Sequence, residues 1–355
     1  MSFNKEEGER YSRHFILEGF GETAQQKLKE ARILVIGAGG LGCPALLYLA
    51  AAGAGTIGIV DDDTVSLSNL HRQVLFASDD IGKLKVDAAS EKLRAQNPNI
   101  LIKTYSVRLN TENALDIIGD FDVVLDGSDN FSTRYLVNDA CVILGKPFVY
   151  AAISTYAAQL SVFNYKEGPT YRCLFPEAPA PGEVPTCAEA GVLGVLPGLA
   201  GTWQALEAIK IITGIGETLS GKLLCFDLLS NTFNTLNIKP VEENRNISRL
   251  GEYDFTCATD QQVDAAAFLA MRKDPQVQVL DVREKTEYDG YNVGGINIPL
   301  SELGARMDEL EQRKTLVICR VGQRSQSAIE LIRQHYPDME LYNLRNGILG
   351  LKGGR

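Results

Sequence analysis

The sequence has no long hydrophobic run and no apolar segment at its start. No stretch reaches the about 18 consecutive apolar residues that a membrane-spanning helix needs, so we expect no membrane span. Residues 1–7 are charged and lack an apolar core, which argues against a signal peptide. We therefore expect a cytoplasmic protein with no membrane partner.

Paired cysteines are missing as well. The seven cysteines are odd in number, irregularly spaced, and include no Cys-x-x-Cys pair. Such usage argues against a disulfide framework and indicates a reducing compartment.

Positive charge is also in short supply. The 355 residues have a formal net charge of -10 and a pI near 5.0, whereas a nucleic-acid-binding domain usually presents a basic face. We therefore expect no nucleic-acid partner, but a local basic pocket for a nucleotide remains open. The hydrophobic fraction of 45% is typical of globular proteins, and the length suits two domains.

Short apolar runs alternate with helical patterns through the first part of the chain. This alternation predicts a parallel sheet with helices on both faces. Runs at 159–165 and 223–227 are expected to add antiparallel strands, so the sheet is mixed. The other expected strands are 32–37, 56–60, 122–126 and 148–152, and the expected helices are 43–52, 83–96, 132–144 and 198–213.

One segment between these elements, and the helix after it, have a distinct sequence pattern. Residues 173–197 are rich in Pro, Glu and Gly and are expected to form a long loop. In the helix that follows, Trp203, Leu206, Ile209 and Ile212 recur at helical spacing, and we interpret this stripe as core packing.

A polar, aperiodic segment divides the chain in two. We assign 1–242 to a Rossmann-like doubly wound α/β domain, 243–261 to a linker, and 262–355 to a smaller α/β domain. In the smaller domain we expect strands at 277–281, 316–319 and 340–344 and a helix at 325–335.

The motif Gly37-x-Gly39-x-x-Gly42 follows the first strand and opens a helix, and Asp61 ends the next strand. Glycines let the backbone approach a phosphate, the helix N-terminus favours its charge, and the acid receives ribose hydroxyls. A nucleotide site is therefore expected here.

Polar side chains after the next strands decide which nucleotide binds. An NAD cofactor is the default for such a loop, but Asn, Arg and Lys side chains are suited to a triphosphate, and a carboxylate can bind Mg²⁺ that bridges phosphate oxygens. The residues concerned are Ser68, Asn69, Leu70, His71, Arg72, Gln73, Lys85, Asp129 and Asn130.

Residues 1–240 resemble the E1-like adenylating enzymes of the MoeB/ThiF type. The motifs are Arg10–Arg13, Gly37–Gly42, Asp61–Gln73, Gly82–Lys85, Asp126–Asn130 and Thr186–Gly191. The resemblance implies that Gly40, Asp61, Ser68–Arg72, Lys85, Asp129 and Asn130 bind ATP and Mg²⁺, with Asp129 on the metal. It also implies a homodimer in which Arg13 reaches the partner's ATP, and a loop thiol, Cys187, that lies over the adenylate.

Many relatives of this type bind zinc through two Cys-x-x-Cys pairs. Here Thr170 stands at the partner position of Cys173, and residues 238–246 contain no cysteine. We therefore predict that the structural zinc site is lost. The thiols other than Cys187 and Cys319 are interpreted as packing or incidental residues; they are Cys43, Cys141, Cys173, Cys225 and Cys257.

Cys319 ends a strand-like run and is followed by the loop Arg320–Ser325 and a helical pattern. Backbone N–H groups, the helix dipole and two arginines are expected to lower the pKa of the Cys319 thiol and to stabilise a thiolate or persulfide. The loop residues are Arg320, Val321, Gly322, Gln323, Arg324 and Ser325.

Residues 262–355 resemble a rhodanese domain. The motifs are Leu280–Tyr288, Gly294–Leu300, Cys319-x-x-Gly322-x-Arg324-Ser325 and Asn346–Ile348. The sequence departs from the pattern at Tyr291, where relatives often have His, and at Leu351, where they often have Trp.

Together the two resemblances imply an enzyme that adenylates the Gly-Gly tail of a ubiquitin-like sulfur carrier. A persulfide on Cys319 would then supply sulfur taken from a cysteine desulfurase or thiosulfate, and Cys187 would release a thiocarboxylate. The carrier of molybdenum cofactor synthesis, a thiamine carrier and a tRNA-thiolation carrier all fit. An NAD-dependent oxidoreductase fused to a sulfurtransferase and a non-catalytic carrier-binding module are the alternatives.

Overall fold

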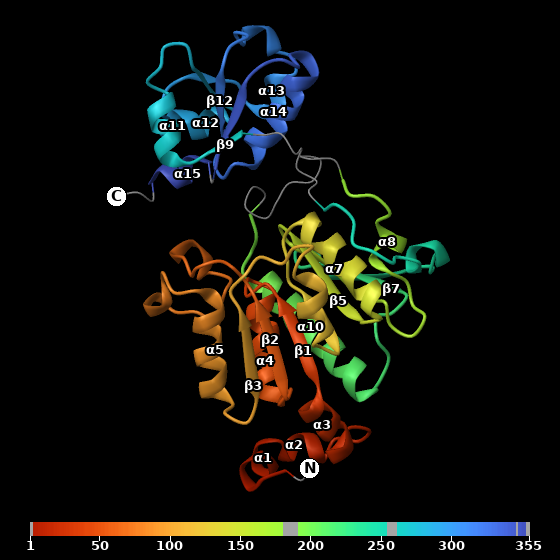
Figure 1. Cartoon of the computed structure of the whole chain (residues 1–355). Coiled ribbons are helices and arrows are strands. Elements are labelled where there is room, and N and C mark those ends of the chain that lie inside the picture. The colour runs from red at the N-terminus through yellow and green to blue at the C-terminus, as the bar shows by residue number, and fades with distance from the viewer. Residues whose placement is uncertain (1–2, 180–190, 254–260, 346, 353–355) are drawn as a thin grey trace. The chain divides into compact units, whose positions relative to one another are not determined.

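The computed structural model describes residues 3–179, 191–253, 261–345 and 347–352. These residues fall into two compact units that divide after Tyr253 (Figure 1). No helix in the described ranges is long and apolar enough to cross a membrane.

The first unit is built on an eight-stranded sheet in the order β3-β2-β1-β4-β5-β6-β7-β8. Strands β3 to β5 of this order run parallel, and the pairs β5–β6, β6–β7 and β7–β8 are antiparallel. The predicted mixed sheet is thus confirmed. The strands are β1 (Arg32–Ile36), β2 (Thr56–Val60), β3 (Leu101–Tyr105), β4 (Val123–Asp126), β5 (Phe148–Ser154), β6 (Ala157–Phe163), β7 (Lys222–Asp227) and β8 (Thr232–Asn237).

Helices connect these strands, and the most apolar of them form the core. Helix α4 is almost entirely buried because nearly all its residues are apolar, and it packs against α5 and α10. The helices are α1 (Lys5–Arg10), α2 (Ser12–Phe15), α3 (Gly21–Glu30), α4 (Gly42–Ala52), α5 (Lys85–Gln96), α6 (Ala114–Gly119), α7 (Phe131–Leu144), α8 (Tyr171–Leu174) and α10 (Val195–Thr213), with short 3-10 turns at Leu67–Asn69, Ser78–Asp80 and Glu242–Arg245.

The apolar stripe predicted on α10 is only partly core. Leu206 is 43% exposed, and the other three stripe residues are half-buried. The buried positions are instead small or polar, such as Ala200, Gln204 and Ala208. The reason is close packing: a Cβ on Gly201 would lie 2.1 Å from the Leu41 carbonyl oxygen, so this side of α10 admits only small residues.

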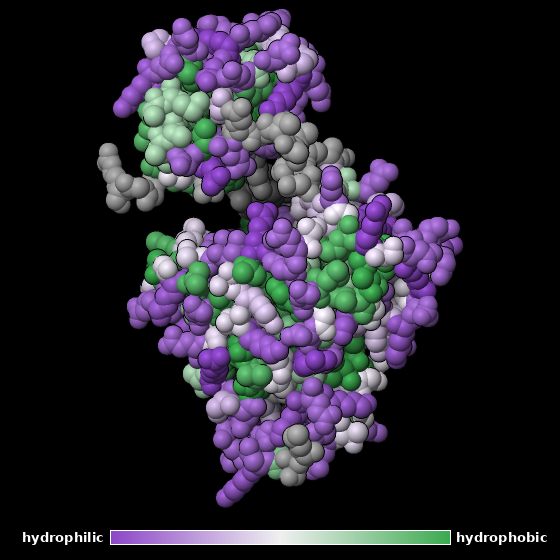
Figure 2. Space-filling model, viewed as in Figure 1, coloured by the Kyte–Doolittle hydropathy of each residue, from purple (hydrophilic) through white to green (hydrophobic). Residues whose placement is uncertain are grey.

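Figure 2 shows hydrophobic residues reaching the surface of the first unit among hydrophilic ones.

The segment after β8 packs on the first unit as far as Tyr253. The Tyr253 hydroxyl donates to Asp139 Oδ2 over 2.7 Å, and Arg245 donates to the Gly168 carbonyl over 2.9 Å. Residues 243–253, which the sequence assigns to a linker, therefore contact the folded body of the first unit.

The second unit is a five-stranded sheet in the order β11-β10-β12-β13-β9, with all pairs parallel. The expected strands and helix of this part are present, and β9 and β11 are additions. The elements are β9 (Gln261–Val263), α11 (Ala265–Met271), β10 (Gln278–Asp281), α12 (Lys285–Gly290), β11 (Ile296–Asn297), α13 (Leu300–Leu303), a 3-10 turn (Met307–Glu309), β12 (Thr315–Ile318), α14 (Gln323–His335), β13 (Leu341–Leu344) and α15 (Gly347–Lys352).

Candidate functional site

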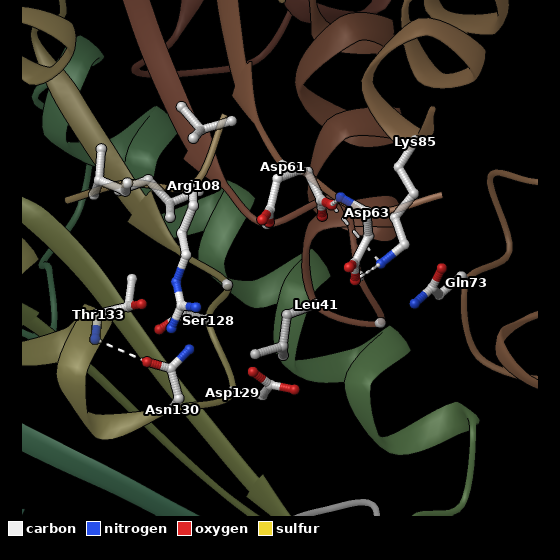
Figure 3. A pocket seen from close by; sticks show the side chains of 18 of the residues that line it. Leu41, Asp61, Asp63, Gln73, Lys85, Arg108, Ser128, Asp129, Asn130 and Thr133 are labelled. Atoms are coloured by element: carbon white, nitrogen blue, oxygen red, sulfur yellow. Dashed lines mark hydrogen bonds and ion pairs between the residues drawn. The ribbon is translucent and has the colours of Figure 1, made fainter. Parts of the chain in front are cut away.

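A cavity of about 410 Å³ lies at the carboxyl ends of the parallel strands β1, β2 and β4 (Figure 3). Ligands of open α/β sheets bind at this edge. Most of the predicted nucleotide residues line it: Gly37, Gly39, Gly40, Asp61, Asn69, Arg72, Lys85, Asp129 and Asn130.

The glycine loop brings backbone to the floor of the cavity. Gly37 has a φ of +89°, which favours glycine, and a Cβ on Gly42 would lie 1.8 Å from the Gly37 carbonyl oxygen. The turn therefore needs both glycines, although Gly42 itself does not line the cavity and serves to start α4.

Asp61 contacts both the glycine loop and Lys85 in the wall of the cavity. One carboxylate oxygen accepts from Ala38 N over 2.8 Å, and the other from Asp63 N over 2.9 Å. Burial raises the pKa of Asp61, although Lys85 and these N–H groups act in the opposite direction. The Lys85 ammonium lies 2.7 Å from Asp63 and 3.8 Å from Asp61, so it is anchored beside the cavity.

The segment 67–73 contributes three side chains to the cavity. Arg72 donates to the Ser68 carbonyl over 3.2 Å and lies 2.8 Å from His71 Nε2. Asn69, Arg72 and Gln73 line the cavity, whereas Ser68, Leu70 and His71 do not. The roles that the resemblance implies for Ser68, Leu70 and His71 stay predictions.

Asp129 and Asn130 follow β4 on a turn that the buried Asp126 shapes by accepting from Ser128 N over 2.9 Å. Asn130 caps α7, because its side chain accepts from Thr133 N over 2.9 Å. The Asp129 carboxylate is exposed in the cavity, as an oxygen ligand for Mg²⁺ would be.

Two side chains of the wall have a buried polar atom with no hydrogen-bond partner among the residues that the structure describes. They are Gln73 Oε1 and Arg134 Nε, whose residues are 3% and 8% exposed. Buried polar atoms are normally paired, so the cavity fits a polar ligand with donors and acceptors, as ATP with Mg²⁺ has.

The sequence analysis missed several lining residues. Arg108 comes from the loop after β3, and Arg134 from α7. Arg134 is 8% exposed and donates to the Ser128 carbonyl over 3.2 Å. Arg108 follows β3, a strand that the sequence analysis did not predict, so no local signal marked this arginine.

The structure does not place two of the predicted catalytic residues at this cavity. Arg13 lies on α2, is exposed, and is not among the lining residues. Cys187 lies outside the described residues, as does Cys257. Their roles stay predictions.

Cys319 follows β12 and is fully buried. Its Sγ receives a hydrogen bond from Gly322 N over 3.0 Å and lies 3.3 Å from Ser325 Oγ. The Ser325 hydroxyl also lies 2.7 Å from Asn343 Oδ1. One backbone N–H therefore points at the sulfur, at the N-terminus of α14. The Ser325 hydroxyl has a single hydrogen, which it shares between Cys319 Sγ and the closer acceptor Asn343 Oδ1.

Hydrogen bonds from two parts of the second unit hold the loop around Cys319. Arg324 binds Glu287 through two hydrogen bonds of 2.8 and 3.0 Å. This pairing lowers the pKa of Glu287 and engages one of the two arginines expected to stabilise the sulfur. On the other side Ile348 N donates to the Cys319 carbonyl over 2.8 Å. Of the two residues that depart from the rhodanese pattern, Tyr291 is exposed and Leu351 is half-buried.

The remaining thiols divide by environment. Cys43 and Cys141 are fully buried, as expected of packing residues. Cys173 differs, because its Sγ accepts from Thr170 N over 3.4 Å and Val241 N over 3.3 Å and lies 3.8 Å from Asn244 Nδ2. Burial alone would raise the pKa of Cys173, but these hydrogen bonds outweigh it and lower the pKa.

The group around Cys173 does not suit a metal. Among the described residues, Cys173 belongs to no group of three or more Cys, His, Asp or Glu ligands, whereas structural zinc takes four such ligands. Within the described ranges, Asp61, Asp62 and Asp63 are the acidic group whose oxygens approach closely enough to share an ion. Loss of the zinc stays a prediction.

The model of the ThiF family matches residues 11–247 of the chain. The chain belongs to the ThiF family. A rhodanese-like domain follows at residues 264–353. Both resemblances inferred from the sequence are thus confirmed.

Curated relatives match either nearly the whole chain or only its first part. A probable adenylyltransferase/sulfurtransferase MoeZ of Mycobacterium tuberculosis is 42% identical over 94% of this chain and 90% of that protein. The adenylyltransferase and sulfurtransferase MOCS3 of Anopheles gambiae is 40% identical over 98% and 86%. A sulfur carrier protein adenylyltransferase of Thermus thermophilus is 50% identical over 67% and 90%.

This ThiF-family chain is therefore an enzyme that combines an adenylyltransferase with a sulfurtransferase domain. The NAD-dependent alternative loses its support. Among solved structures, Escherichia coli MccB has a TM-score of 0.61 at 24% identity, covering 68% of this chain and 75% of that one, which shows the fold of the first unit.

Proposed function

We propose that the chain adenylates the C-terminal glycine of a ubiquitin-like sulfur carrier with ATP and converts it to a thiocarboxylate. The observation that supports this most is the convergence of Asp61, Arg72, Lys85 and Asp129 on one cavity beside the glycine loop. The same chain also directs the Gly322 N–H at the Cys319 sulfur.

In the first step, a carrier carboxylate oxygen attacks the α-phosphorus of ATP, and pyrophosphate leaves. The carboxylate is already ionised, so catalysis consists of positioning and charge neutralisation. Arg72 and Lys85 are two of the lining cations and would face the phosphates, and Arg13 would come from the second subunit of a homodimer. Mg²⁺ on Asp129 would offset charge on the phosphate oxygens.

In the second step, the terminal sulfur of a Cys319 persulfide attacks the acyl adenylate, and AMP leaves. The product is an acyl disulfide on Cys319. The Cys187 thiolate then attacks the Cys319 sulfur, which releases the carrier thiocarboxylate and leaves a Cys187–Cys319 disulfide for an external thiol to reduce. The donor that loads Cys319 is a cysteine desulfurase or thiosulfate.

Among the possible pathways we propose molybdenum cofactor synthesis, since relatives named MoeZ and MOCS3 share both domains over most of their length. Activation of a thiamine carrier or a tRNA-thiolation carrier uses the same chemistry and is the alternative.

Exchange of labelled pyrophosphate into ATP in the presence of a Gly-Gly-tailed carrier tests the adenylation step. Asp129→Ala should reduce exchange about 100-fold, because the metal loses its carboxylate. Asp116→Ala, an exposed carboxylate of α6 that does not line the cavity, should leave it unchanged. Two results would contradict the proposal: pyrophosphate exchange by the wild-type chain that does not depend on the carrier, and undiminished exchange by Asp129→Ala.

A further inference from the structure

Arg108 projects into the nucleotide cavity from an ordered loop. It lies between β3 and α6, where its carbonyl accepts from Asn113 Nδ2 over 3.0 Å. Its neighbours Val107 and Leu109 also line the cavity. In Figure 3 the Arg108 side chain extends into the cavity rather than away from it.

The other three cations of the wall already have partners. The Lys85 ammonium binds Asp63 at 2.7 Å, Arg72 donates to the Ser68 carbonyl over 3.2 Å, and Arg134 donates to the Ser128 carbonyl over 3.2 Å. The Arg108 guanidinium, by contrast, forms no hydrogen bond and no ion pair with any residue in the described part of the chain.

An unpaired guanidinium over this cavity is suited to an anion. It has five N–H donors in a planar fork that matches the oxygens of a phosphate. The floor beneath it is the glycine loop at the start of α4, where backbone N–H groups also favour negative charge. The unpartnered Gln73 Oε1 and Arg134 Nε in the same wall indicate that a polar ligand completes the site.

We propose that Arg108 binds a phosphate group of the nucleotide. The proposal rests on the function proposed above, in which that nucleotide is ATP. Arg108 adds a cation that would face the phosphates from the side of the cavity opposite Lys85 (Figure 3). Its contribution is to nucleotide binding, whereas Arg72 and Lys85 are fixed in place before the nucleotide arrives.

Equilibrium binding of ATP and of adenosine by the full chain tests this proposal. Arg108→Gln should weaken ATP binding about tenfold or more, as expected for loss of a charge-assisted hydrogen bond, and leave adenosine binding unchanged. Arg108→Lys should fall between, because it keeps the charge without the fork. Arg249→Gln, an exposed arginine outside the cavity, is the matched control.

Unchanged ATP binding by Arg108→Gln would overturn the proposal. An equal loss for ATP and adenosine would also overturn it, because the contact would then be to the nucleoside. ATP binding by the wild-type chain tests the proposed function separately. If the wild-type chain binds no ATP, both the proposed function and the role of Arg108 are overturned. If the wild type binds ATP and Arg108→Gln binds it equally well, only the role of Arg108 is overturned.

Discussion

At the scale of single residues, the cysteines show how environment separates chemically identical groups. Burial raises the pKa of Cys43 to about 12 and also raises that of Cys141, so both stay thiols at neutral pH. Hydrogen bonds lower the pKa of Cys173, which is half-exposed. The sequence interpretation treated these three thiols alike, because hydrogen bonds from Thr170 and Val241 depend on tertiary contacts that no local pattern reveals.

This difference predicts the order of alkylation. Since only the thiolate reacts, Cys173 should react with iodoacetamide at least about tenfold faster than Cys43 or Cys141 at pH 7.5, and its rate should level off at lower pH than that of a free cysteine. Peptide mass spectrometry of timed samples measures the rates. Equal rates for Cys173 and Cys141 would contradict the assigned environments.

At the scale of structural elements, the sequence predicted the type of most strands and helices because periodicity and glycine position are local. It failed where long-range packing decides. The close contact of Gly201 with Leu41 turns the apolar stripe of α10 partly outward, and β9 and β11 are too short for a pattern. In the candidate site, the glycine loop and the charged residues after strands were predictable, whereas Arg108 and Arg134 needed the fold.

Gly347 connects α15 to the loop that holds Cys319. It has a φ of +55°, and a Cβ there would lie 2.5 Å from the Cys319 carbonyl oxygen and from Val321 N. Gly347→Ala should therefore destabilise the second unit by about 2 kcal/mol and displace the Cys319 loop. We expect sulfur transfer from thiosulfate to cyanide to fall at least about tenfold.

The matched control is Gly304→Ala. Gly304 has right-handed helical φ and ψ, and its Cβ would meet only Leu331 at 3.9 Å. Melting curves and the transfer assay should leave this variant near the wild type. If Gly347→Ala also kept the wild-type rate of sulfur transfer, the close contact of Gly347 with the Cys319 loop would not be needed for activity.

At the scale of the whole molecule, one chain combines a nucleotide cavity in its first unit with a reactive-loop cysteine in its second. Composition and charge predicted a two-domain protein without nucleic-acid features, and the motifs predicted both families. The identity of the carrier could not be predicted, since recognition depends on a surface that no motif specifies. The central claim is that the two units perform successive steps on one substrate.

The most direct test of this claim is the intact mass of a Gly-Gly-tailed carrier after incubation with the chain, ATP, Mg²⁺ and thiosulfate. Wild-type chain should replace one carboxylate oxygen by sulfur. Cys319→Ala should retain carrier-dependent pyrophosphate exchange yet form no thiocarboxylate, and Cys225→Ala should match the wild type. Thiocarboxylate formed at the wild-type rate by Cys319→Ala would contradict the account.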